Sequence, residues 1–121
     1  MEKILQYMWQ FRMWGSSEKV LSDGRRVMLL DPGKLNADAG PDFFNAKVKI
    51  GDTLWVGNVE IHRRSSDWRQ HGHHTNVRYD SVVLHVAETV DVPLTRTDGT
   101  LIPQLELKVP QHIIDNYEQL R

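Results

Sequence analysis

Apolar side chains recur at helical spacing at both ends of the chain. Residues 2–14 carry a broad apolar stripe with polar side chains at the other angles, which predicts an amphipathic helix. Gly15-Ser16-Ser17 predicts the end of that helix. Residues 111–120 show a second stripe directly after Pro110, a residue type that favours the start of a helix. The pattern therefore predicts a helix near each end.

Between these helices the pattern changes to that of β-strands. Residues 25–30 are predicted to form a hairpin with residues 18–22, and residues 33–42 to form a loop rich in turn formers. Alternating runs over 43–50 and 54–62 predict a second hairpin, because Gly-Asp stands between them as a two-residue turn signal.

The alternation also assigns faces to the second hairpin, since side chains two residues apart on a strand point the same way. On the second strand, Asn58, Glu60 and His62 share a face. On the first strand, the apolar face is predicted to consist of Phe44, Ala46, Val48 and Ile50.

The second half of the chain predicts a short helix, a buried strand and a third hairpin. Ser65 to His71 form the helix, with Trp68 as a core anchor. The continuous apolar run within 80–87 is typical of a central strand. The turn Asp98-Gly99 predicts a hairpin between 90–96 and 101–108. This element order predicts an α+β fold with a central mixed sheet flanked by helices.

Composition narrows the class of protein. The 121 residues suit one domain, residues 1–121, although a chain that stops inside a helical pattern is expected to be a piece of a longer protein. The absence of cysteine excludes disulfides and cysteine-ligated metals and favours a cytoplasmic location. No apolar run is long enough to cross a membrane. A net charge of −1 argues against a generic, strongly basic nucleic-acid binder.

The candidate chemistry lies around Asp42, Glu60 and His62. Paired strands would bring Asp42 beside the other two side chains, and two carboxylates suit Mg²⁺ or Mn²⁺. A bound ion would activate water, while His62 contacts that water or a substrate phosphate. The basic residues nearest this triplet are candidate phosphate contacts, with nucleic acid as the partner: Lys47, Arg63 and Arg64.

Pro41-Asp42, a spacer and then Glu60-Ile61-His62 resemble the motif of the PD-(D/E)xK nuclease superfamily. The resemblance implies a core order of helix, three antiparallel strands, helix and strand. It also implies Asp42 and Glu60 as ligands of the metal, with His62 in the place of the motif lysine. Histidine departs from that pattern because its imidazole is mostly neutral at pH 7.

A second resemblance covers nearly the whole chain. The strings DAGPDFFNAKVKIGDTLWVGNVEIH, SSDW, VVLHV, RTDG and IPQLEL, together with Tyr79, are similar to the N-terminal part of a bacterial domain of unknown function. That family is best represented in Bacteroidetes, and its full members are considerably longer. The resemblance implies no activity.

The histidines offer an alternative reading. His62, His71 or His73, and His85, with Glu60, would suit zinc, iron or nickel, as in small-barrel dioxygenases and isomerases. Against this, His73 and its neighbour His74 are predicted to lie exposed in a flexible loop. His85 among valines is interpreted as a core histidine with a hydrogen-bonded partner. A third alternative is a non-catalytic interaction module whose polar cluster is a satisfied hydrogen-bond network.

Overall fold

The computed structural model describes residues 1–14 and 18–120, and all structural statements below concern these residues. The helices are α1 (Glu2–Gln10), α2 (Asp67–Gln70) and α3 (Gln111–Leu120), with short 3₁₀ turns η1 (His73–Thr75) and η2 (Val77–Tyr79). The strands are β1 (Lys19–Val20), β2 (Arg26–Asp31), β3 (Lys34–Leu35), β4 (Phe43–Ile50), β5 (Thr53–Arg64), β6 (Val82–Thr89) and β7 (Gln104–Glu106).

Within the described residues these strands form one mixed, seven-stranded sheet in the order β1-β2-β4-β5-β6-β7, with β3 also paired to β4. The first half of the sheet is antiparallel, whereas β5, β6 and β7 run parallel. The crossover from β5 to β6 contains α2 and both 3₁₀ turns, as a parallel connection requires. The predicted α+β class with a mixed sheet is confirmed.

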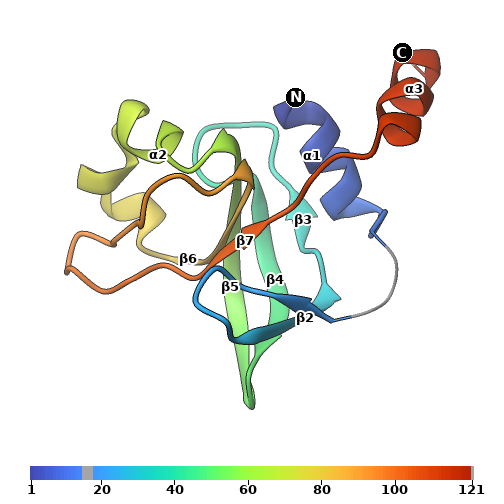
Figure 1. Ribbon diagram of the computed structural model, residues 1–121. Helices are drawn as coiled ribbons and strands as arrows, with labels where there is room; N and C mark the ends of the chain where they lie inside the picture. Colours follow the sequence, from blue (N-terminus) through green and yellow to red (C-terminus); the bar gives the residue numbers. More distant parts are fainter. Residues whose placement is uncertain (15–17, 121) are drawn as a thin grey trace.

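The sheet curls until it is nearly barrel-shaped (Figure 1). The two ends of the strand order approach each other, because the backbone N–H of Ser22, just after β1, donates to the carbonyl of Gln104 in β7 at 3.0 Å. α1 packs against β5, and α3 packs beside α1, where Tyr7 meets Tyr117 edge to face at 5.7 Å. In the described residues, no helix is both long and apolar enough to span a bilayer.

Trp68 anchors a second, smaller core beneath α2, as predicted. It is 1% exposed and packs with Tyr79, Val82, Leu94 and Ile102. This smaller core holds the β5–β6 crossover against the sheet. That crossover carries His71, His73 and His74.

Several predicted boundaries need correction. The first helix ends at Gln10 rather than residue 14, and the predicted cap at residues 15–17 lies outside the described residues. The loop 33–42 contains β3, which pairs with β4. The predicted hairpin between 90–96 and 101–108 forms only next to its turn, where Thr95 bridges Leu101 and the N–H of Ile102 donates to the carbonyl of Leu94 at 2.9 Å. Its full length is wrong, because the following strand, β7, pairs in parallel with β6 instead.

The predicted apolar face of β4 is wrong at one position. Phe43 is fully buried, whereas Phe44 is only partly buried. The cause is a register irregularity between Phe43 and Ala46, where Asn45 adopts φ 58°. An irregular residue shifts the alternation, so side chains before it exchange faces. From Ala46 onward the predicted alternation holds.

Replacing Gly57 with alanine should destabilise the sheet. A Cβ there would overlap Cγ1 of Val83 and lie 2.9 Å from the carbonyl oxygen of Ser81. We expect a loss of about 1–3 kcal/mol in the free energy of unfolding, measured by urea titration. Val56→Ala, at an exposed neighbouring position, is the control and should cost less than about 1 kcal/mol. Equal stabilities for the two variants would contradict the predicted overlap.

Candidate functional site

Pairing of β4 with β5 places Asp42 beside Glu60. The register sets Phe43 opposite Val59, so the preceding residue on β4 faces the following residue on β5. The backbone N–H of Asp42 donates to Glu60 Oε1 at 3.1 Å, and the N–H of Ile61 donates to Asp42 Oδ2 at 2.8 Å. The structure therefore brings the two predicted acidic residues together.

Asn36 organises the loop that delivers Asp42. Its side-chain nitrogen donates to the carbonyls of Ala39 and Pro41 at 3.1 and 2.9 Å, and its Oδ1 accepts from the N–H of Asp38 at 3.0 Å. Its own N–H donates to the carbonyl of Asp42 at 2.8 Å. Asparagine in a turn-rich loop was a signal that could have identified this role, because its side chain readily replaces backbone partners.

The acidic pair is electrostatically costly without a cation. Glu60 is 4% exposed, and Asp42 is partly buried. Burial, and then repulsion from Glu60, raise the pKa of Asp42 to about 7, although the N–H of Ile61 opposes the shift. Burial likewise raises the pKa of Glu60 to about 7, against hydrogen bonds from Asp42. Two such carboxylates favour a shared proton or a bound cation.

Three histidines gather on the other side of Glu60. Nε2 of His73 lies 2.9 Å from Glu60 Oε2, and Nε2 of His62 lies 3.3 Å from the same oxygen. One ring nitrogen from each of His62, His71 and His73 lies within 4.8 Å of the other two. Gly72, between His71 and His73, adopts φ 75°, a left-handed conformation that favours glycine. The imidazoles on either side of it both approach His62.

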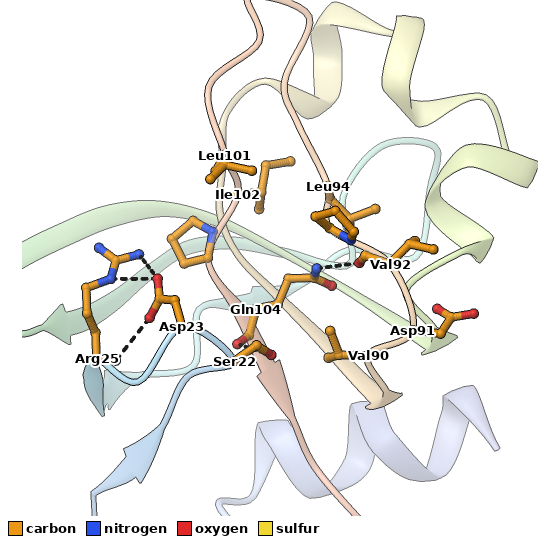
Figure 2. A pocket seen from close by; sticks show the side chains of 12 residues that line it. Ser22, Asp23, Arg25, Val90, Asp91, Val92, Leu94, Leu101, Ile102 and Gln104 are labelled. Carbon is orange, nitrogen blue, oxygen red and sulfur yellow. Dashed lines mark hydrogen bonds and ion pairs between the residues drawn. The ribbon is translucent and has the colours of Figure 1, made fainter.

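A buried hydrogen-bond chain leads away from His62. Its Nδ1 lies 2.8 Å from Nε2 of His85, whose Nδ1 lies 3.1 Å from Oε1 of Gln104. The amide nitrogen of Gln104 donates to the carbonyl of Val92 at 2.8 Å, as Figure 2 shows. Gln104 also lines a surface pocket of about 380 Å³ beside Ser22. The hydrogen-bond chain therefore runs from the histidine cluster to the place where the two ends of the strand order, β1 and β7, approach each other.

Aromatic packing holds the imidazole rings in place. His73 stacks on Tyr79 with centroids 3.6 Å apart and planes 15° apart. Trp68 presents near-perpendicular contacts to His73 and His85 at 5.3 and 5.5 Å. Rings held by packing cannot easily turn away from a ligand, so the cluster is preorganised.

Burial keeps the inner histidines neutral. It lowers the pKa of His62 to about 2 and that of His85 to about 3, and it lowers the pKa of His73. His71, by contrast, is exposed. A neutral imidazole has one nitrogen with a free lone pair, which is the form that binds metal ions.

The predicted phosphate contacts lie at different distances from this cluster. Arg63 and Arg64 are exposed at the end of β5, directly after His62. Lys47 is exposed but pairs with Val56, about 13 Å along the strand from Glu60 at the usual rise per residue. The structure does not bring Lys47 to the acidic pair.

The structure tests two predictions about the burial of individual histidines. The prediction that His73 lies on an exposed loop is wrong, since it is 8% exposed and bonded to Glu60. The core interpretation of His85 is confirmed, because it is fully buried and both ring nitrogens have partners. Sequence reasoning missed Gln104, which reaches His85 only because the parallel register sets the two side by side.

Comparison with protein-family models matches residues 2–121 to a family described as "Protein of unknown function (DUF2851)". The search of curated proteins finds no match, and the search of solved structures finds none either.

Proposed function

The chain belongs to the DUF2851 family, whose description assigns no activity, and from the site we propose a metal-dependent phosphodiester hydrolase of nuclease type. The observation that carries this proposal is the meeting of Asp42 and Glu60, each hydrogen-bonded to the other's strand. Two ionised carboxylates in a mostly buried position repel each other, and a divalent cation bound between them removes this repulsion.

The order of elements supports a nuclease-like core. Along the chain come α1, the antiparallel strands β2, β4 and β5, then α2, then β6 parallel to β5. With the two-residue strands β1 and β3 left out, this order is similar to the one that the PD-(D/E)xK resemblance implies, with Asp42 directly before the second of these strands and Glu60 within the third. The family description itself names no nuclease.

In this proposal Asp42 and Glu60 hold a divalent ion, Mg²⁺ or Mn²⁺, which supplies an activated water and neutralises charge on the phosphate. His62 replaces the motif lysine but stays neutral, so it accepts a hydrogen bond from the water rather than supplying a positive charge. Arg63 and Arg64, exposed at the strand end, supply that charge to the phosphate. Lys47 lies too far along β4 to contact the same phosphate.

Chelator-treated protein should cleave a phosphodiester only after a divalent ion is added. The assay uses bis(p-nitrophenyl) phosphate and labelled single- and double-stranded DNA and RNA, each with Mg²⁺, Mn²⁺ or neither. Asp42→Asn should abolish the metal-dependent rate, whereas Asp38→Asn, an exposed acid in the same loop, should retain it. Cleavage that persists in chelator, or no cleavage of any of these substrates, would rule out the proposal.

A second candidate is a histidine-ligated transition-metal enzyme that does not hydrolyse phosphodiesters. The convergence of His62, His71 and His73 favours it, and so does the near-barrel curvature of the sheet. Tight binding of zinc, iron or nickel by a protein that cleaves none of the above substrates would support this candidate over the first.

A further inference from the structure

We infer that His62, His71 and His73, with Oε2 of Glu60, form a binding site for one divalent transition-metal ion, and that Gln104 positions His62 through His85. The inference goes beyond the proposed hydrolase, because it concerns which metal binds and what orients its ligand. Its tests measure metal binding and histidine tautomers, so they do not depend on whether the bound ion takes part in phosphodiester cleavage.

The ligand spacing fits one ion. Four ligands at zinc–nitrogen and zinc–oxygen distances of about 2.0–2.1 Å stand about 3.3 Å apart in a tetrahedron. Glu60 Oε2 lies 3.3 Å from Nε2 of His62 and 2.9 Å from Nε2 of His73. The third imidazole, from His71, has a nitrogen within 4.8 Å of the other two. Rotation of the exposed His71 side chain toward Glu60 would close the set around one ion.

The two oxygens of Glu60 face different partners. Oε1 accepts from the backbone N–H of Asp42, whereas Oε2 points to the histidines. The histidine side of Glu60 offers mainly imidazole nitrogen. Nitrogen ligands favour Zn²⁺, Co²⁺, Ni²⁺ or Fe²⁺ over Mg²⁺, which prefers oxygen. An ion on the histidine side of Glu60 is therefore expected to be a transition metal, whereas an ion on the Asp42 side is expected to be Mg²⁺.

The hydrogen-bond chain fixes the tautomer of His62. The carbonyl of Val92 can only accept, so the amide nitrogen of Gln104 must face it, and Oε1 of Gln104 must face His85. Nδ1 of His85 therefore carries the proton and donates, which leaves its Nε2 as an acceptor. His62 must then donate from Nδ1. The free lone pair of His62 consequently lies on Nε2.

That lone pair points at a negatively charged partner. Nε2 of His62 and Oε2 of Glu60 stand 3.3 Å apart, and with this tautomer both are acceptors when Glu60 is ionised. A cation between them turns the repulsion into two bonds. Metal-binding histidines commonly donate their other ring N–H to a protein acceptor, which orients the ring. His85 is that acceptor here, and Gln104 holds His85 in the required tautomer.

The site is also open on one side. His62 and His73 are 1% and 8% exposed, but His71 is exposed. An ion can therefore arrive from solvent through His71 and bind ligands that are already in place. The same exposure makes this residue the best position for mutation, because its loss should not disturb the core.

The first test is titration of the chelator-treated chain with Co²⁺, followed by visible absorption, and with Zn²⁺ in competition. We expect one equivalent to bind, with intense tetrahedral-type bands. His71→Ala should lower the affinity at least tenfold, whereas His112→Ala, an exposed histidine on α3, should leave it unchanged. Absence of stoichiometric binding, or equal affinities for His71→Ala and the wild type, would overturn the site.

The second test addresses Gln104. In ¹⁵N-histidine spectra of the metal-free wild type, His62 and His85 should both be Nδ1–H tautomers. Gln104→Met keeps the length but removes the acceptor, so His85 and His62 should lose this preference. Metal affinity should fall about 10–100-fold. An Nε2–H tautomer for His62 in the wild type would overturn the positioning role, and that measurement needs no variant to fold.

The two proposals fail in different ways. Co²⁺ binding without phosphodiester cleavage would remove the hydrolase and leave the histidine site. Mg²⁺-dependent cleavage by a chain that does not bind Co²⁺ would leave the hydrolase and overturn the site.

Discussion

Glu60→Gln should reduce metal-dependent phosphodiester cleavage at least about a hundredfold, since even loss of an outer partner of a metal ligand commonly costs 10–100-fold. Glutamine keeps the size of the side chain but removes its charge. In the native chain this carboxylate accepts from Asp42 on one oxygen and contacts His62 and His73 with the other. Its carboxylate therefore links the acidic pair to the histidine cluster.

The activity loss must be separated from misfolding. Glu118→Gln, the same change at an exposed site on α3, is the matched control and should keep full activity. Thermal melting in chelator should show both variants folded. If Glu60→Gln is folded and cleaves at the wild-type rate, Glu60 has no part in the reaction.

Asp42→Asn should make the metal-free protein more stable at pH 8 than the wild type, with a smaller difference at pH 5. The pKa of Asp42 is raised from 3.8 to about 7 in the folded chain. A raised pKa contributes stability at low pH that is lost as pH rises, here between about 4 and 7. Asparagine removes this loss. Because partial exposure screens the repulsion, we expect about 1–2 kcal/mol at pH 8.

The difference in stability between Asp42→Asn and the wild type reports on the acidic pair, although the buried histidines also make stability depend on pH, in the opposite direction. The lowered pKa values of His62 and His85 give stability that is present above about 6.5 and is lost as pH falls. Both proteins contain these histidines, so their contribution cancels in the difference. Unfolding in chelator at pH 5 and pH 8 checks the result, with Asp38→Asn as control. A difference that does not grow with pH would contradict the raised pKa.

The acidic half of the site could be predicted from the sequence because it depends on local rules. A two-residue turn after Ile50 fixes the register of β4 against β5 as far as Ala46 opposite Gly57, and a one-residue shift between Phe43 and Ala46 then brings Asp42 opposite Glu60. Alternation along β5 then puts His62 on the face of Glu60. The turn and the alternation could be predicted from the pattern, whereas the irregularity at Asn45 could not.

The histidine half depends on long-range packing and was not predictable in the same way. His73 looked exposed because a Gly-His-His run is polar, yet stacking on Tyr79 and contact with Glu60 bury it. Gln104 was hidden by a strong hairpin signal at Asp98-Gly99. The strand that follows this turn pairs in parallel with β6, and nothing in a turn motif specifies that choice.

The position of β7 in the chain has a consequence for biosynthesis. Every proposed metal ligand is translated before Gln104, yet the hydrogen-bond chain that sets the tautomer of His62 ends on that last strand. A nascent chain that ends before β7 holds all the ligands but lacks the amide that orders them. The proposed metal site is therefore expected to reach its final hydrogen-bonded arrangement only after the sheet has received its last strand.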